Sequence, residues 1–164
     1  MNKKYSLSFV PFLKNDLYGT IIKLNSENLV LSTIDYDLLI NRDKNRELFE
    51  SALKNNIELA RECIECGVDI NNRQGVDGFT PLIAAAYSGS LDVLKLLINK
   101  GADINLCCYK GSSPLMHAMY SYKKNGKKDT FEFLEKKNAN QELVDIYQKS
   151  IRDYAKEMKI FGII

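Results

Sequence analysis

Four cysteines and one histidine are the residues of this 164-residue chain best suited to bind a metal or to act as nucleophile and base. Cys63 and Cys66 have the C-x-x-C spacing of half a zinc site. Two further sulfurs could come from the adjacent pair Cys107-Cys108, but this pair lacks the two-residue gap of a zinc knuckle. No βαβ pattern surrounds the first pair, as a thioredoxin-like redox motif would require. Buried or unreactive thiols are the favoured interpretation and a metal site the alternative, so we expect no metal and no cofactor.

His117 is the single histidine, and no recognisable motif places a nucleophile beside it. The sequence also lacks a glycine-rich phosphate loop and a paired-carboxylate pattern. Acid–base and nucleophilic catalysis therefore have no candidate set of residues. We expect a protein that is not an enzyme.

The composition is that of one soluble domain with a buried core. Hydrophobic residues make up 45% of the chain, charged residues 27%, and the formal net charge is +2. This balance lacks the basic excess of a dedicated nucleic-acid binder. No apolar run approaches the ~18 residues that span a bilayer, and the N-terminal apolar stretch has no signal-peptide cleavage site. We expect a cytoplasmic protein that binds neither nucleic acid nor membrane, with secretion as an effector left open.

Two sequence markers recur in the middle of the chain with one period. Residues 67–71 (GVDIN) recur 34 positions later as residues 101–105 (GADIN), and residues 80–82 (TPL) recur 33 positions later as SPL. Thr80 can cap a helix with its hydroxyl, and the following proline fits the first helical position. Gly89 and Gly101 can take the left-handed conformation that ends a helix. The pattern predicts a unit of helix, tight turn, helix and extended turn.

Residues 77–105 resemble the ankyrin repeat in nearly every marker, from DGFTPLIAAAYSG through VLKLL to GADIN. Ile83 replaces the usual histidine after Pro-Leu, which is a structural residue in that family. The resemblance implies a mainly α fold, an ankyrin-repeat solenoid of helix-turn-helix units. About three repeats are expected, at residues 45–74, 75–107 and 108–137.

The flanking repeats depart from the family pattern. The first lacks the Thr-Pro start and has Asn55 where the inter-helix glycine would stand. In the third, the second helix is delayed to residues 130–136, with Phe131 and Leu134 facing the core. An insertion of about five residues around 123–128 is expected to lengthen the loop between the helices.

Both ends of the chain fall outside the repeat and are interpreted as caps. Residues 1–44 are expected to form an N-terminal extension with a β-hairpin at 19–24 and 28–34, while a helix over 27–40 is the alternative. Residues 138–164 are expected to form a C-terminal capping helix, with a partner-binding helix as the alternative. Its apolar stripe recurs every three or four positions, at Leu143, Tyr147, Ile151, Tyr154, Met158 and Phe161.

The resemblance implies a protein–protein interaction module that binds a partner through the concave surface of turn tips and first helices. Carried onto this chain, that surface comprises Arg73, Val76, Asp77, Phe79, Tyr87, Ser88, Tyr109, Lys110, Ser112, Tyr120 and Ser121, with Asn45, Leu53 and Lys54 extending it. Four of these residues are aromatic, fall where the repeat core does not need them, and are typical interface anchors. Tyr87 and Tyr120 lie 33 positions apart and are expected to stack. The alternative is that these rings only half-cover neighbouring helices.

The expected partner is another protein, and the chain is expected to be a monomer when free. Small bacterial ankyrin proteins suggest a toxin-neutralising immunity protein. The alternatives are a secreted effector that binds a host protein and a structural, self-assembling subunit. The basic block at residues 123–128 is interpreted as a solvated loop or as an electrostatic contact to an acidic partner.

Overall fold

The computed structural model describes residues 33–158 of the chain, with side chains from Lys44 onward. This described part is helical and carries only isolated β-bridges outside the helices. None of its helices is long and apolar enough to cross a membrane. The seven helices are α1 (Thr33–Lys54), α2 (Ile57–Glu65), α3 (Pro81–Ser88), α4 (Leu91–Asn99), α5 (Pro114–Asn125), α6 (Asp129–Lys136) and α7 (Ile151–Glu157).

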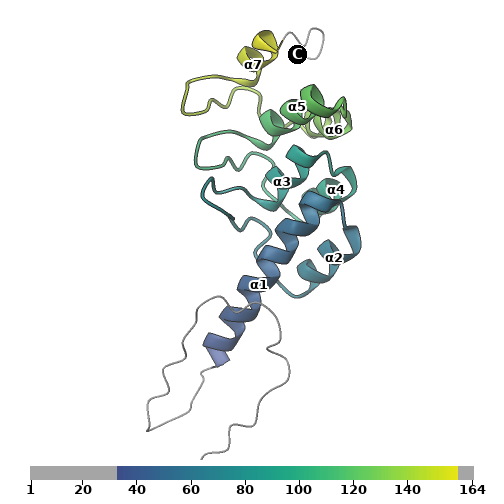
Figure 1. Cartoon of the computed structure of the whole chain (residues 1–164), viewed down its shortest axis with the longest axis vertical. Helices are drawn as coiled ribbons and strands as arrows, with labels where there is room; N and C mark the ends of the chain where they lie inside the picture. Colours follow the sequence, from purple (N-terminus) through teal and green to yellow (C-terminus); the bar gives the residue numbers. More distant parts are fainter. Residues whose placement is uncertain (1–32, 159–164) are drawn as a thin grey trace, which may run out of the picture. The chain divides into compact units, whose positions relative to one another are not determined.

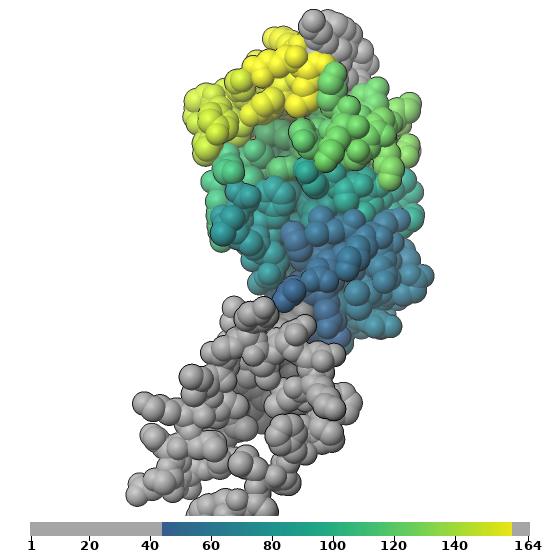
Figure 2. Space-filling view, in the orientation of Figure 1, coloured from purple at the N-terminus to yellow at the C-terminus, as the bar shows by residue number. Residues whose placement is uncertain are grey.

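The helices pack in two columns, as an ankyrin solenoid requires. Helices α1, α3, α5 and α7 contact one another in order, and we call them the first-helix column. Helices α2, α4 and α6 form the second column, and each packs against the first helix of its own repeat. Extended turns between the repeats project from one side of the columns (Figure 1). The repeats follow one another as layers from blue to yellow in Figure 2.

Local capping explains where the first helices begin and end. The hydroxyls of Thr80, Ser113 and Ser150 accept hydrogen bonds from backbone N–H groups three residues further on, in α3, α5 and α7. Helix α3 then ends at Gly89, whose φ of 73° is left-handed. The predicted start and end of α3 are confirmed. Asn55 has a φ of 54° and so takes the left-handed position of the missing glycine.

The core lies between the two columns. Leu82, Leu94 and Leu97 are fully buried, and so are Phe131 and Leu134, as predicted for the delayed second helix of the third repeat. Cys63 is also buried, and it occupies the same position in the first repeat as Leu97 does in the second. Ile83, which replaces the usual histidine, is fully buried as well. Because the helices approach closely there, the three alanines of α3 are also inaccessible to solvent.

The insertion in the third repeat lengthens a helix, and the predicted long loop is wrong. Helix α5 has 12 residues where α3 has 8, so about one extra turn absorbs most of the insertion. No helix breaker occurs before Gly126, whose φ is 70° and whose N–H donates to the carbonyl oxygen of Tyr122. Only residues 126–128 then separate α5 from α6.

The predicted boundary at residues 44/45 lies inside a helix. Helix α1 begins at Thr33 and continues through this boundary to Lys54. Of the predicted hairpin, Thr33 and Ile34 are helical, and the rest lies outside the described residues. The alternative of a helix over 27–40 agrees with the structure at residues 33–40.

The predicted C-terminal helix is present only as the short α7, so its predicted start at residue 140 is wrong. Asn138 and Gln148 have left-handed φ values of 59° and 58°, which interrupt any helix there. Residues 139–149 instead form an extended turn, and the bridge between Val144 and Ser150 resembles the bridge between Gln74 and Phe79 in the complete repeat. A capping box between Ser150 and Asp153 then starts the short α7. This region is thus the first half of a further, degenerate repeat.

Candidate functional site

Three turns lead into the first helices: the first precedes α3 (residues 66–80), the second precedes α5 (100–113) and the third precedes α7 (137–150). Polar and aromatic contacts join the tips of the first and second turns. The Tyr109 N–H donates to the Asp77 carbonyl oxygen at 2.9 Å, and Lys110 Nζ lies 2.8 Å from Asp77 Oδ1. The Arg73 guanidinium lies 5.1 Å from the centroid of the Tyr109 ring, within cation–π range. Gly78 has a φ of 66°, and a Cβ there would lie 2.6 Å from that ring. These contacts hold the tips of the first and second turns in one fixed arrangement.

The third turn is linked to the second in the same way. The N–H of Ile146 donates to the carbonyl oxygen of Lys110 at 2.9 Å. Large apolar side chains are exposed along the tips, with Val76 at 95% and Tyr147 at 67% exposure.

Aromatic rings from α3, from α5 and from the turn just before α3 gather beside one another. The rings of Tyr87 and Tyr120 are stacked, with centroids 5.6 Å apart and planes at 7°. The predicted stacking of these two tyrosines is confirmed. His117 lies edge-on to Phe79 at 4.8 Å and to Tyr87 at 6.2 Å. We call these four residues the aromatic cluster.

His117 is neutral at physiological pH. Burial lowers its pKa to about 4, and the nearby Asp77 carboxylate opposes this shift only weakly. Its buried Nε2 has no hydrogen-bond partner among the described residues. The aromatic cluster therefore contains a neutral ring with one unused polar atom.

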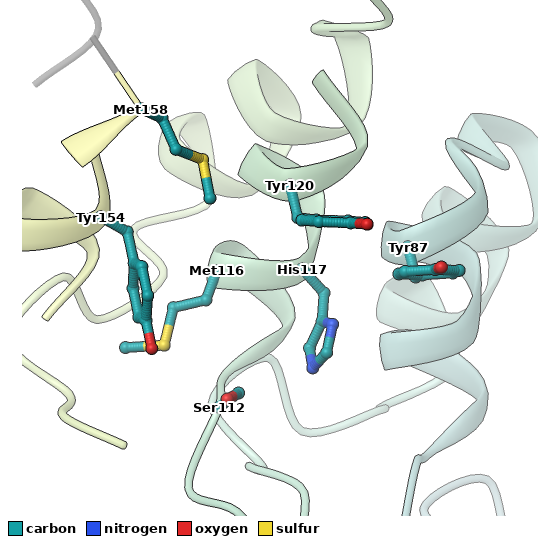
Figure 3. A pocket seen from close by; sticks show the side chains of 7 residues that line it. All are labelled: Tyr87, Ser112, Met116, His117, Tyr120, Tyr154 and Met158. Carbon is teal, nitrogen blue, oxygen red and sulfur yellow. The ribbon is translucent and has the colours of Figure 1, made fainter. Parts of the chain in front are cut away.

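A cleft of about 300 Å³ opens beside the aromatic cluster, between α3, α5 and α7 (Figure 3). Rings and thioethers make up most of its wall, as in many sites that bind apolar groups. Its lining consists of Tyr87, Ser112, Met116, His117, Tyr120, Tyr154 and Met158.

The wall of the cleft on α7 is held by a buried carboxylate. Tyr154 donates its hydroxyl to Asp145, which also accepts the backbone N–H groups of Tyr147 and Lys149. Burial raises the pKa of Tyr154 to about 12, and the hydrogen bond to Asp145 adds to this rise. Burial of Asp145 would raise the pKa of its carboxyl, but these hydrogen bonds lower it overall. The pair is thus a hydroxyl and an ionised carboxylate at neutral pH.

Three lysines at the end of α5 and just after it form what we call the lysine rim: two of them contact residues that line the cleft, and the third lies against Gly89 at the end of α3. Lys123 Nζ donates to the Met158 carbonyl oxygen at 3.0 Å. Lys124 Nζ lies 5.9 Å from the ring centroid of Tyr87. The Lys127 side chain lies against Gly89, where an added Cβ would meet it at 3.0 Å. The side chains are exposed, so their charge faces solvent.

The structure divides the predicted site residues into four sets. Arg73, Val76, Asp77, Tyr109 and Lys110 form the turn tips, while Phe79, Tyr87, Ser112 and Tyr120 lie in the aromatic cluster or the cleft. Leu53 and Lys54 are exposed at the end of α1, and Asn45 is half-buried. The fourth set comprises the buried Ser121 and the half-buried Ser88.

Ser121 is a correction to the predicted surface, whereas Ser88 is half-buried and its predicted role stays a prediction. Ser121 has 0% exposure, so it cannot contact a partner. The Ser88 hydroxyl donates to the carbonyl oxygens of Ala52 and Ala84, which ties α3 to the preceding repeat. Both serines occupy one repeat position, 33 residues apart, where neighbouring helices meet and a small side chain is needed.

Four residues of the cleft were missing from the predicted site. These are Met116, His117, Tyr154 and Met158. His117 stands 33 positions after Ala84, so a bulky ring at a small-residue position was the available signal. The α7 residues could not be found, because the turn before α7 was predicted as helix.

The cysteines show no arrangement for chemistry. All four are free thiols, and burial raises the pKa of Cys63 and of Cys107, which makes them weak nucleophiles. Within the described residues, no group of three or more His, Cys, Asp or Glu side chains could hold a metal ion.

Paired helices stacked in two columns, with turns projecting from one side, define a helix-turn-helix repeat protein. A family model of ankyrin repeats, in three copies, matches residues 48–145, more than half of the chain. The chain therefore belongs to the ankyrin-repeat family. Ankyrin repeats are generally protein–protein interaction modules without catalytic activity.

Several relatives found by sequence comparison are ankyrin-repeat proteins of which this chain matches less than a fifth of the length. An ankyrin repeat protein of Rickettsia bellii is 32% identical over 145 residues, which are 88% of this chain and 17% of that protein. The BRCA1-associated RING domain protein 1 of Caenorhabditis elegans is 31% identical over 71% of this chain and 16% of its own length. The ankyrin repeat and SAM domain-containing protein 6 of the rat is 31% identical over 55% and 11%.

Proposed function

We propose that the chain is a non-enzymatic module that binds a partner protein across the aromatic cluster and the turn tips. The observation that carries this proposal is the stacked pair Tyr87 and Tyr120, which stands beside an open cleft. Tyr120 is 42% exposed, although Met119 and Ser121, the residues on either side of it in α5, are buried. Such placement is typical of an interface anchor.

The physical argument is that these rings need little reorganisation to bind. A tyrosine has only two side-chain torsions to fix, and stacking already restricts both rings before a partner arrives. The entropic cost of association is then lower than for a flexible side chain. Truncation of an anchor in a hot spot costs about 2 kcal/mol or more of binding free energy.

The test is a pull-down from the native source with the wild type and the double variant Tyr87→Ala/Tyr120→Ala. Phe133→Ala is the matched control, since this half-buried aromatic residue lies on the second-column helix α6, away from the turn tips, the aromatic cluster and the cleft. We expect the double variant to lose a partner that the wild type and the control retain. Far-UV circular dichroism checks that all three are folded. Equal recovery by all three proteins would refute the aromatic cluster as the binding site.

Within this proposal, the narrower role is that of a cytoplasmic immunity protein that covers the active site of a toxin. Co-expression would then rescue growth of cells that produce the toxin, and Tyr87→Ala/Tyr120→Ala would abolish the rescue. Capture of a host protein instead would favour the alternative, a secreted effector.

A self-assembling subunit is the remaining alternative, and a measurement of molecular mass in solution distinguishes it from a monomeric binding module. We propose a monomer in the free state, for which light scattering gives 18.7 kDa at every concentration. A mass that rises with concentration would support self-assembly.

A further inference from the structure

We propose that the cleft between α3, α5 and α7 takes one large apolar side chain from an acidic segment of the partner, with the lysine rim holding the flanking carboxylates. This inference rests on the proposed function and specifies the chemistry of its partner. It concerns a subsite that includes α7, beyond the turn tips and the stacked tyrosines.

The size and lining of the cleft fit a single side chain. Its volume of about 300 Å³ is at the lower end of the range for small-molecule pockets. Two methionines, Met116 and Met158, face the cleft from α5 and from the end of α7 (Figure 3). Thioether side chains adapt to irregular apolar shapes and contact aromatic rings favourably. A phenylalanine, leucine or methionine side chain is therefore the kind of group that the cleft accommodates.

The charges around the cleft differ in whether they are already paired. Asp77 forms an ion pair with Lys110, and Glu157 forms one with Lys149. Asp145, which is buried, accepts hydrogen bonds from Tyr154 and two backbone N–H groups. Each of these carboxylates is therefore either paired with a lysine or buried.

The lysine rim, by contrast, forms no ion pair with the part of the chain whose side chains the structure describes. Within residues 44–158, no carboxylate forms an ion pair with Lys123, Lys124 or Lys127. Helix α3 carries no charged side chain, and the charged side chains of α5 are Lys123 and Lys124. The cleft thus opens beside unpaired positive charge, and charge complementarity selects an acidic segment over a basic one.

The extended helix α5 is what brings the rim to the cleft. The extra turn carries Lys123 and Lys124, and it is absent from α3. Lys123 then reaches the carbonyl oxygen of Met158, at the far side of the cleft. An insertion that departs from the repeat pattern therefore supplies the charge of the proposed subsite.

The test uses the full-length chain and three fluorescein-labelled peptides. One has phenylalanine flanked by glutamates, the second has alanine in place of phenylalanine, and the third has phenylalanine flanked by lysines. Fluorescence anisotropy is measured at low salt and at 0.5 M salt. The nuclear magnetic resonance signal of the single histidine, His117, reports directly on occupation of the cleft.

We expect only the acidic phenylalanine peptide to bind and to shift the His117 signal. Replacement of phenylalanine with alanine should weaken binding at least about tenfold. The variant Lys123→Gln/Lys124→Gln/Lys127→Gln should lose roughly two- to five-fold in affinity per lysine at low salt. Its matched control is Lys100→Gln/Lys136→Gln/Lys137→Gln, three exposed lysines at the ends of the second-column helices, which should bind as the wild type does.

Three outcomes would overturn the inference. Equal binding of the acidic and basic peptides would contradict the role of the lysine rim. An unchanged His117 signal at saturation would place the peptide elsewhere. Binding only after deletion of residues 159–164 would assign the cleft to this chain's own C-terminal segment. In each of these cases, the pull-down with Tyr87→Ala/Tyr120→Ala remains a separate test. If this variant no longer captures the native partner, the proposed function stands and only the acidic-segment inference fails.

Discussion

Replacement of His117 with leucine should remove most of the acid sensitivity of this fold between pH 6.5 and pH 4. In the folded chain, burial lowers the pKa of His117 from 6.5 to about 4. A difference of this size corresponds to about 3 kcal/mol of unfolding free energy, at about 1.4 kcal/mol for each pH unit. The whole contribution comes from one side chain, because the sequence contains one histidine.

The direction follows from which state binds the proton. The unfolded chain takes up a proton on His117 below about pH 6.5, whereas the folded chain does so only near pH 4. Unfolding therefore takes up a proton between these values, and stability falls as the pH falls. Above pH 6.5 this contribution to stability is fully present, and below about pH 4 it is lost. Carboxyl groups with lowered pKa, such as that of Asp145, act at still lower pH.

Leucine at position 117 keeps an apolar group of similar size and cannot bind a proton. At pH 7 we expect its stability to lie within about 1 kcal/mol of the wild type. The lost edge-on contacts with Phe79 and Tyr87 are partly offset by removal of the unpartnered Nε2. Between pH 7 and pH 4, the wild type should lose about 3 kcal/mol more than the variant.

The assay is urea denaturation followed by far-UV circular dichroism at five pH values from 7 to 4. In parallel, the single histidine signal is titrated by nuclear magnetic resonance, which needs no assignment. A midpoint near 6.5 in the folded chain, or parallel loss of stability in both proteins, would refute the burial of a neutral imidazole.

Three further substitutions test the local geometry by urea denaturation at pH 7. Gly78→Ala should destabilise the fold by about 1–3 kcal/mol, because Gly78 has a left-handed φ and an added Cβ would meet the Tyr109 ring at 2.6 Å; a neutral result would contradict the tip packing. Thr80→Ala should cost about 1 kcal/mol by removing the cap that accepts the Ile83 N–H, and Thr80→Ser, which keeps the hydroxyl, serves as its control. Phe131→Ala should cost about 3–5 kcal/mol, since this side chain is fully buried; a loss below 1 kcal/mol would mean that α6 is not docked as described.

The complete repeat was predictable from sequence because its signals are local. Thr80 and Pro81 start α3, and Gly89 ends it, through contacts within a few residues of each other. The stacking of Tyr87 on Tyr120 followed from the period alone, since equivalent positions in adjacent repeats lie side by side. These inferences require no knowledge of distant contacts.

The C-terminal region was not predictable, because distant contacts and backbone conformation decide it. The apolar spacing that suggested one long helix includes Leu143 and Tyr147, yet both belong to the turn before α7. Asp145 stabilises that turn by accepting the N–H groups of Tyr147 and Lys149, which competes with helix formation. Without this turn, α7 could not be placed beside α5, and the cleft could not be foreseen.

The surface prediction failed where periodicity could not separate outward from inward positions. Ser88 and Ser121 follow the exposed-looking tyrosines of α3 and α5 directly, and a small polar residue suits either environment. The structure places Ser121 between helices, where its hydroxyl has no partner among the described residues. A polar residue type therefore did not decide burial at this position.

The bonds between turns also determine how the molecule would respond to a pulling force. A single backbone hydrogen bond joins the first turn to the second, and another joins the second to the third. Force along the stack would load these bonds together with the packing between successive first helices, so the repeats should detach one after another. Full extension of a 33-residue unit releases about 110 Å of chain, while the unit from Ser113 to Lys149, which is 37 residues long, releases about 125 Å. Because of the insertion in α5, the unfolding of this repeat should appear as the longest extension step in a single-molecule force trace.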